Sequence, residues 1–323
     1  MIDLVMREVN NLKDLDHQNI ISFKIAFKSD ENTKLNIITE YADSGDLNQK
    51  LKEQLQQKKY FEEKLLLDWL FQSCLALEYI HNKNIIHRDI KPSNILLNNN
   101  NIIKLSDFGV SKNISIFKST KTLIGTPLYL APEILKVKEE KKPYSFKADI
   151  WSLGVTFCHL MSLEFPFEGK GNENVYDNIK KGNKNKKILN ENNNNYNENI
   201  SKHFSKEFRD LIDEMMTIEP EKRPSAEEIL KKDIIKNRMI SFYNENKNNF
   251  DYYEAEKFIE KYKFENENNE TSKKNINDIK IDDSDDLNKT EEMTPVKPEK
   301  IKYDYLRQMS FLHVQIKRIK TNV

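Results

Sequence analysis

The 323-residue sequence contains little glycine and little cysteine, with 7 and 2 residues respectively. Cys74 and Cys158 both fall in apolar helical patterns, so we expect buried free thiols in a reducing compartment and no disulfide framework. No run of about 18 apolar residues is present, which argues against a membrane span. The first residues, MIDLVMRE, lack the long apolar segment of a signal peptide. These absences favour a soluble cytoplasmic protein, with a nuclear location left open.

An excess of charge of either sign is also missing. Lys and Arg together number 52, as do Asp and Glu, so the formal net charge is zero. A strongly basic chain is typical of proteins that bind nucleic acids or membrane surfaces, so this balance argues against both partners. The hydrophobic content of 37% is enough for a substantial core in a chain of this length.

Apolar spacing predicts both helices and strands in the N-terminal part of the chain. Helices are expected over residues 2–15 and 61–81, because apolar residues recur there at steps of three and four. Strands are expected at residues 20–27, 34–41 and 102–105, where β-branched and apolar residues cluster between polar turns.

The next part is predicted to be mainly helical. Residues 148–161 are apolar on almost all sides, which is typical of a helix buried in a core. Ser205 is a candidate N-cap for a helix to Met216, and Ser225 can cap a final helix to about Ile235. Residues 183–199 are rich in Asn and Lys, and we expect them to form a disordered insertion.

The end of the chain is polar, and residues 243–299 are expected to be a disordered linker. Residues 300–323 are expected to form a short, basic, amphipathic helix. Two roles stay open for it: a helix that docks on the rest of the chain or frays, and a helix over residues 300–320 that binds a partner or a second copy. Its apolar stripe follows steps of four and three residues: Tyr305, Met309, Leu312, Ile316 and Ile319.

Three short motifs carry the chemistry of the sequence. Residues 87–94 read HRDIKPSN, residues 107–109 read DFG and residues 131–133 read APE. Two acids and one amide at this spacing are what phosphoryl transfer from Mg-ATP requires, and the order of the motifs is the protein-kinase signature. The chain resembles eukaryotic serine/threonine protein kinases over residues 2 to about 242.

The resemblance implies an α+β, protein-kinase-like fold. Residues 1–42 would be a partial small lobe with one helix and two strands, and residues 43–242 a complete helical large lobe. The remaining tail would be largely disordered. The implied function is transfer of the ATP γ-phosphate to Ser or Thr hydroxyls of protein substrates, with ATP and Mg²⁺ as cofactors.

The resemblance also assigns catalytic and metal-binding roles. Asp89 would be the base that orients the substrate hydroxyl, and Lys91 would offset the charge of the transferring phosphate. Asn94 and Asp107 would be the Mg²⁺ ligands, since hard oxygen ligands suit that ion.

Four further residues would contact the nucleotide or lie beside it. Glu40 and Ala42 would bind adenine through their backbone groups, and Leu96 would line the nucleotide site. Two roles stay open for Asp46. It could contact ribose or a basic residue of the substrate, or it could be the N-cap of the helix that begins near Leu47.

The resemblance implies regulatory roles around the loop from Asp107 to Glu133. Arg88 would pair with a phosphate on this loop, and Thr122 is the expected phosphorylation site. Thr126 would bridge the catalytic acid and lysine.

Three other residues are expected to be structural. Glu133 would form a buried ion pair with Arg223, which is costly to break from one side. Asp149 would anchor the backbone of residues 87–94, the catalytic loop.

The sequence contains no G-x-G-x-x-G motif, and a lysine on the strand that follows such a loop is not found. In the family both elements precede the helix that carries Glu8, the expected partner of that lysine. The two remaining strands would leave an unpaired edge where a third should lie. Three explanations stay open: an incomplete form of an ordinary kinase with weak or no activity, a catalytically impaired scaffold that binds protein partners, and strands supplied by a partner.

Four segments resemble the NIMA-related kinases in particular. They are residues 8–12 (EVNNL), 44–47 (SGDL), 125–127 (GTP) and 229–242 at the end of the domain.

Overall fold

The computed structural model describes residues 12–28, 34–108, 128–135, 145–169, 172–189, 195–246 and, for the backbone, 314–320. The chain divides into two compact units, of which the first is Met1–Phe242 with Gln315–Val323 and the second is Tyr243–Val314. Nearly all of the described residues belong to the first unit, which holds every predicted site residue.

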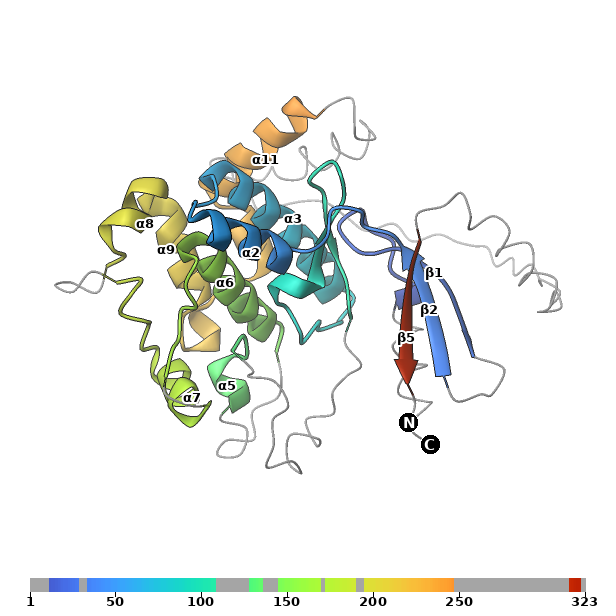
Figure 1. Cartoon of the computed structure of the whole chain (residues 1–323), viewed down its shortest axis with the longest axis horizontal. Helices are drawn as coiled ribbons and strands as arrows, with labels where there is room; N and C mark the ends of the chain where they lie inside the picture. The colour runs from blue at the N-terminus through green and yellow to red at the C-terminus, as the bar shows by residue number, and fades with distance from the viewer. Residues whose placement is uncertain are drawn as a thin grey trace, which may run out of the picture. The chain divides into compact units, whose positions relative to one another are not determined.

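A three-stranded sheet forms from segments at opposite ends of the sequence. Its order is β1 (Phe23–Lys28), β2 (Lys34–Glu40) and β5 (Val314–Lys320), with β2 in the middle (Figure 1). Strands β1 and β2 are antiparallel, with Ala26 opposite Ile37 and an irregular register between Phe23 and Ile25. The two strands predicted in this region are therefore present.

Strand β5 corrects two predictions. The helix predicted over residues 300–323 is wrong for residues 314–320, and the edge of β2 predicted to be unpaired is hydrogen-bonded to β5. A stripe of about two heptads gives a short helix little stability of its own. Pairing with a sheet uses backbone groups instead, whatever the side-chain period.

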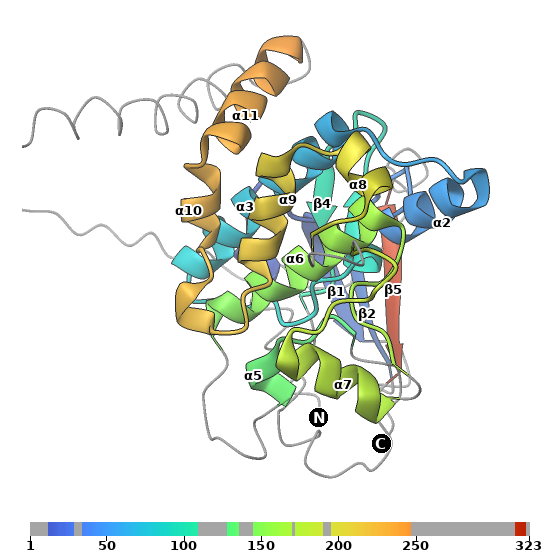
Figure 2. The same ribbon diagram turned by 90° about the vertical axis from the view of Figure 1, so that its left-hand side faces the viewer.

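Two long helices form the centre of the helical region. Helix α3 (Glu63–Asn82) contacts α6 (Phe146–Ser162), and both are labelled in Figures 1 and 2. The prediction of a helix buried on all sides is confirmed for α6, because Trp151 and Phe157, on different sides of the helix, are fully buried. The sheet-to-helix connection runs through α2 (Leu47–Gln57).

Shorter helices surround this pair. Ser205 caps α9 by accepting from the backbone N–H of Phe208, and Ser225 forms a capping box with Glu228, so both predicted caps are present. The predicted last helix is divided, because α10 ends at Leu230 and α11 begins at Asp233. The shorter helices are α5 (Pro132–Leu135), α7 (Asn172–Lys181), α8 (Glu198–His203), α9 (Lys206–Met215), α10 (Ala226–Leu230) and α11 (Asp233–Glu245).

The predicted disordered insertion at residues 183–199 is wrong for its described parts. Asn185 is buried, and its amide group donates to the Phe165 carbonyl at 3.1 Å. Tyr196 is also buried, and its hydroxyl donates to Asp213 on α9. A few well-placed residues therefore order a segment whose composition alone indicates disorder.

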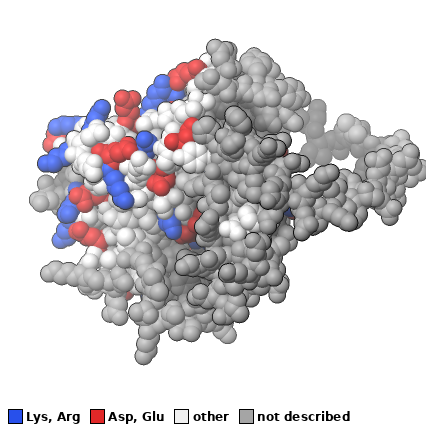
Figure 3. Space-filling view, turned by 45° about the vertical axis from the view of Figure 1, so that its right-hand side comes forward, with Lys and Arg blue, Asp and Glu red and all other residues white. Residues whose placement is uncertain are grey.

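Charges are mixed on the surface. Positive and negative side chains alternate over the described part of the face in Figure 3, in line with the balanced composition. Among the described residues, no helix combines the length and apolar character that crossing a membrane requires.

Candidate active site

A short hairpin brings together the two residues predicted to bind Mg²⁺. Strand β3 (Ile95–Leu97) pairs antiparallel with β4 (Ile103–Leu105), and Ile95 lies opposite Leu105. The residues just outside this pair meet as well, because the Ser106 N–H donates to the Asn94 carbonyl at 2.9 Å. Asp107 follows directly, so the hairpin places it at the same end as Asn94.

Asp89, Lys91 and Asn94 form one hydrogen-bonded cluster. Oδ2 of Asp89 accepts from Lys91 Nζ at 2.7 Å and from Asn94 Nδ2 at 3.0 Å. Asn94 Nδ2 also donates to the Asp89 carbonyl at 2.7 Å. The Asp89 and Lys91 side chains are 32% and 33% exposed, so a substrate hydroxyl can approach this carboxylate.

The donor set fits a Mg²⁺ ion with a nucleotide. The amide nitrogen of Asn94 is engaged by Asp89, which fixes Oδ1 as the part of the side chain that can take a cation. Asp107 adds a carboxylate at the same end of the hairpin. Among the described residues no cluster of three His, Cys, Asp or Glu side chains could hold a metal alone. Two protein ligands are enough for Mg²⁺, because this ion usually keeps several waters and also binds phosphate oxygens of the substrate.

Asp149 on α6 holds the backbone of the catalytic loop. Its carboxylate is fully buried and accepts from the backbone N–H groups of His87 and Arg88, each at 2.9 Å. Its Oδ2 also lies 2.9 Å from Nε2 of His81. Arg88 has a φ of 70° and Asp107 a φ of 57°, left-handed values that cost about 1–3 kcal/mol each in residues other than glycine. These contacts stabilise the strained backbone at Arg88.

His87 packs as a core residue. Burial lowers the pKa of its imidazole, so the ring is neutral at pH 7. Its Nε2 lies 3.0 Å from the Ser106 carbonyl, and its ring lies 4.9 Å from that of Phe108. The ring therefore connects the catalytic loop to the DFG segment.

Glu40 is held at the end of β2 by both its backbone and its side chain. Its N–H donates to the Ser22 carbonyl, and its Oε1 accepts from the Ser22 N–H, both at 2.8 Å. The same Oε1 lies 2.8 Å from Nζ of Lys104 on β4. The sequence analysis missed Lys104, because no motif or spacing relates it to Glu40.

The segment after Glu40 is fixed to β3. The Ser44 N–H donates to the Leu97 carbonyl at 2.9 Å, and the Leu97 N–H donates to the Gly45 carbonyl at 2.8 Å. Leu96 is half-buried between two buried neighbours, so it faces the other side of the hairpin. Ala42 is half-buried in the connecting segment.

Asp46 acts as a helix cap. Its Oδ1 accepts from the Gln49 N–H at 2.8 Å, which makes it the N-cap of α2. Of the two alternatives left open for Asp46, the cap is therefore present.

Arg223 and Glu133 form the expected buried ion pair. The guanidinium donates to both carboxylate oxygens of Glu133, at 2.8 and 2.7 Å. Its three remaining N–H groups donate to the carbonyls of Thr217, Lys147 and Ile218. All five donors of a side chain in a residue only 1% exposed therefore have partners.

Three predicted residues lie outside the described residues. They are Glu8, Thr122 and Thr126.

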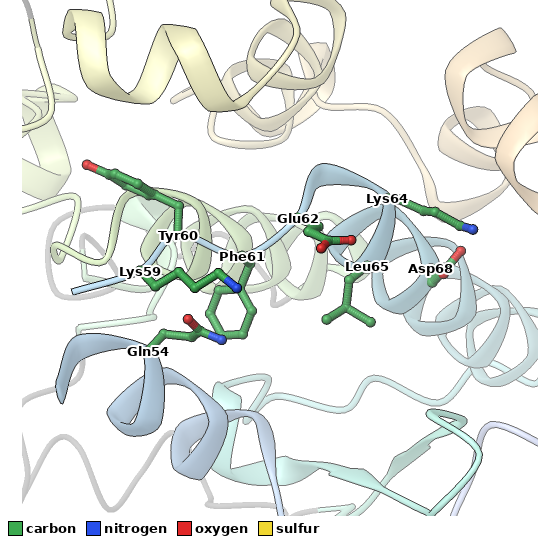
Figure 4. Close-up of a pocket in the computed structure, with 8 residues that line it drawn as sticks. All are labelled: Gln54, Lys59, Tyr60, Phe61, Glu62, Lys64, Leu65 and Asp68. Atoms are coloured by element: carbon green, nitrogen blue, oxygen red, sulfur yellow. The ribbon is translucent and has the colours of Figure 1, made fainter. Parts of the chain in front are cut away.

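A cavity of about 330 Å³ lies apart from this cluster, between the end of α2 and the beginning of α3 (Figure 4). Lys59 and Lys64 line it together with Glu62 and Asp68, so its charges are mixed. It contains none of the residues predicted to bind nucleotide. The full lining is Gln54, Lys59, Tyr60, Phe61, Glu62, Lys64, Leu65 and Asp68.

Comparisons with known proteins agree with the geometry. The protein kinase domain model matches residues 2–235. The probable serine/threonine-protein kinase nek3 of Dictyostelium discoideum is 39% identical over 229 residues, which are 70% of this chain and 19% of that protein. The serine/threonine-protein kinase nekl-2 of Caenorhabditis elegans is 34% identical over 245 residues, 74% of this chain and 63% of that protein. These relatives agree with the resemblance to NIMA-related kinases.

Solved structures show the same fold. The Rad53 kinase domain with SCD2 has a TM-score of 0.56 and 27% identity, over 72% of this chain and 78% of that one. Rad53 1-466 in complex with AMP-PNP has a TM-score of 0.55 and 28% identity, over 71% and 53%. The chain spans only 19% of the nek3 kinase and 18% of mouse Nek1, so it corresponds to a small part of these relatives.

Proposed function

Because the chain belongs to the protein kinase family, we propose that it transfers the γ-phosphoryl group of ATP to serine and threonine hydroxyls of proteins. The observation that carries this proposal is the cluster in which Lys91 and Asn94 both bond to Oδ2 of Asp89. A carboxylate held at two points and still one-third exposed can orient an incoming hydroxyl.

Asp89 acts as the base of the reaction. The substrate oxygen attacks the γ-phosphorus, the bond to the β-phosphate oxygen breaks, and ADP leaves. Asp89 accepts the hydroxyl proton late, because little covalent bonding forms before the transition state. The ammonium group of Lys91, 2.7 Å from the carboxylate, offsets the negative charge at this point.

Asn94 and Asp107 hold Mg²⁺ in this proposal. The ion, when bound, neutralises the phosphates. The backbone groups of Glu40 and Ala42 would bind adenine, and Leu96 would contribute an apolar side chain to the nucleotide site. A solved neighbour, Rad53 1-466, is in complex with AMP-PNP, which supports nucleotide binding by this chain.

The test measures phosphate transfer by the purified full chain. Labelled Mg-ATP at millimolar concentration is incubated with a generic protein substrate, and the labelled amino acid is identified. The incubations are long, because a sequence without a G-x-G-x-x-G motif is expected to have weak activity. The Asp89→Asn variant should reduce transfer about 10²–10⁴-fold, since it removes the proton acceptor but keeps the hydrogen bonds.

The outcome separates an enzyme from a scaffold. Label on serine and threonine that depends on Asp89 supports the kinase. Binding of Mg-ATP by a folded chain with no transfer that depends on Asp89 would instead support a scaffold for protein partners.

A further inference from the structure

We propose that the cavity between α2 and α3 is a docking site for an acidic linear segment of a protein substrate, with leucine-sized side chains at its centre. That the segment belongs to a substrate rests on the proposed function, whereas binding itself does not depend on catalysis. The cavity contains none of the residues that the phosphoryl-transfer site uses. Its volume of about 330 Å³ lies at the lower end of the range found for ligand-binding cavities.

Apolar side chains form part of the cavity wall. Phe61 is buried, and its ring packs edge-on against that of Trp69, with 5.6 Å between the ring centroids. Leu65, one helical turn further along, is half-buried and lines the same cavity. Leu55, the neighbour of Gln54 in sequence, is 44% exposed and adds apolar surface to α2. An apolar side chain that enters the cavity would remove such surface from water, which favours binding.

Gln54 supplies a hydrogen-bond acceptor to this wall. Its Oε1 is shielded from solvent and has no hydrogen-bond partner among the described residues. A buried acceptor without a hydrogen bond destabilises the fold, and a donor that reaches it is bound favourably. Figure 4 shows the Gln54 amide on the α2 side, close to Lys59 and Phe61. The acceptor therefore favours a ligand with N–H groups, as the backbone of a peptide has.

The charges that line the cavity favour an acidic ligand. Of the two acids in the lining, Asp68 is neutralised, because its carboxylate accepts from Nε and Nη2 of Arg238 at 2.5 and 3.0 Å. This leaves Lys59 and Lys64 against Glu62. Electrostatic complementarity of this kind selects partners of the opposite sign.

Neighbouring charges do not reverse this balance. The Glu63 carboxylate accepts from the Ser205 N–H, and Glu53 pairs with Lys50 at 3.3 Å. Lys58 is exposed and adds a positive charge next to Lys59 in sequence. Helix α3 begins at this cavity, and the N-terminal end of a helix also favours an anion. The surroundings of the cavity are therefore positive.

Docking at this cavity would act on substrate binding and not on the chemical step. A segment held there keeps the rest of the substrate near the chain, which raises the effective concentration of its Ser and Thr hydroxyls at Asp89. A substrate with such a segment should therefore have a lower KM and the same kcat as one without it.

Fluorescence anisotropy with the purified full chain tests the binding. The probe is the labelled peptide ADDLLDDA, and the matched peptides are ADDSSDDA, which lacks leucine, and AKKLLKKA, which reverses the charge. The Lys59→Glu variant should weaken binding of the probe at least tenfold. Lys181→Glu, the same change at an exposed lysine of α7, should leave binding unchanged. No binding of the probe, equal binding of the three peptides or an equal loss in both variants would overturn the proposal.

The Gln54→Met variant tests the unpartnered acceptor. Met has a similar length but no amide oxygen, so binding of the probe should weaken about threefold to tenfold. The free energy of unfolding should stay the same or rise, because a buried acceptor without a partner is removed. Unchanged affinity, or a clear fall in stability, would contradict the role given to Gln54.

A variant in the tail distinguishes a substrate from the chain itself as the occupant. Residues 281–287 read IDDSDDL and also combine acids with leucine. The four aspartates of this segment are replaced by asparagine in the full chain, and affinity for the probe should stay the same. Binding that appears only in this variant would show that the chain's own segment occupies the cavity, and it would overturn the proposal of a substrate.

Kinetics with a docked substrate complete the test. A generic protein substrate that carries ADDLLDDA on a flexible linker should have a KM at least fivefold lower than the same substrate with ADDSSDDA. Lys59→Glu should abolish this difference and leave kcat unchanged. A probe that binds without any change in KM would show that the occupant is not a substrate segment. The Asp89→Asn variant should bind the probe normally, so failure of catalysis and failure of docking are distinguishable.

Discussion

The catalytic loop and the three-stranded sheet are stabilised by different kinds of contact. In the loop, side chains bond to nearby backbone: Asp149 accepts from His87 and Arg88, and Asn94 donates to the Asp89 carbonyl. In the sheet, backbone pairs with backbone, and one partner of β2 comes from the far end of the sequence. The loop depends on particular residues, whereas the sheet depends on which strand lies at its edge.

This difference extends to backbone strain. Arg88 and Asp107 have positive φ values beside the proposed reaction centre. In the described backbone of β1 and β2, no residue has a positive φ. Strain near a site persists only where surrounding contacts fix it, and the dense bonding around Asp149 supplies such contacts. We therefore expect single substitutions to have large effects in the helical region and smaller effects in the sheet.

The largest effect on stability is expected for Arg223→Met. The change leaves the Glu133 carboxylate, which is 9% exposed, without its partner and leaves three carbonyls without a donor. Breaking one side of a buried pair costs about 3–5 kcal/mol. Chemical denaturation should show this fall in the free energy of unfolding.

A double variant sharpens this result. Glu133→Leu combined with Arg223→Met removes both charges, and buried ion pairs replaced by apolar residues are often close to neutral. The double variant should therefore recover part of the stability that the single variant loses. If the loss in the free energy of unfolding of the double variant equals the sum of the losses of the two single variants, Glu133 and Arg223 are not coupled.

The sequence predicted the loop much better than the sheet. Asp89, Asn94 and Asp107 are set by a short motif and a hairpin whose strands are neighbours in sequence, so spacing was enough to relate them. The contact between Glu40 and Lys104 joins residues that no pattern connects. The apolar stripe of residues 305–319 predicted a helix, whereas residues 314–320 pair as a strand, because edge pairing leaves no periodic signal.

Acid is expected to have an intermediate effect on stability, because it protonates His159 on α6. Burial lowers the pKa of His159 from 6.5 to about 4, and its Nδ1 lies 3.2 Å from the Tyr129 hydroxyl. The unfolded chain binds a proton below its ordinary pKa of 6.5, while the folded chain resists it until about 4. The free energy of unfolding should therefore fall as the pH drops from about 6.5 to 4, by on the order of 1 kcal/mol per pH unit.

Thermal unfolding at several pH values measures this contribution. The His159→Gln variant should be less stable at pH 7, yet lose less stability than the parent between pH 6.5 and 4. His203 on α8 is exposed, so His203→Gln serves as the control and should keep the parental slope. An identical slope in the His159 variant would show that this histidine does not titrate with unfolding.

The smallest effect on stability is expected at the contact between β4 and the three-stranded sheet. Lys104→Met keeps most of the apolar stem but removes the ammonium group 2.8 Å from Glu40 Oε1. Glu40 still accepts from the Ser22 N–H, so the free energy of unfolding should fall by only about 1 kcal/mol or less. Hydrogen exchange should increase at the end of β2 and remain unchanged at residues 87–94.

A nearby histidine reports the same change independently. Burial first, and then the charge of Lys104, lower the pKa of His17 to about 4. Removing that charge favours the protonated ring, so Lys104→Met should raise the His17 pKa in an NMR titration. Lys24→Met, on the exposed side of β1, is the matched control and should leave this pKa unchanged. If both variants shift the titration equally, the effect comes from the overall charge and not from the contact between Lys104 and the sheet.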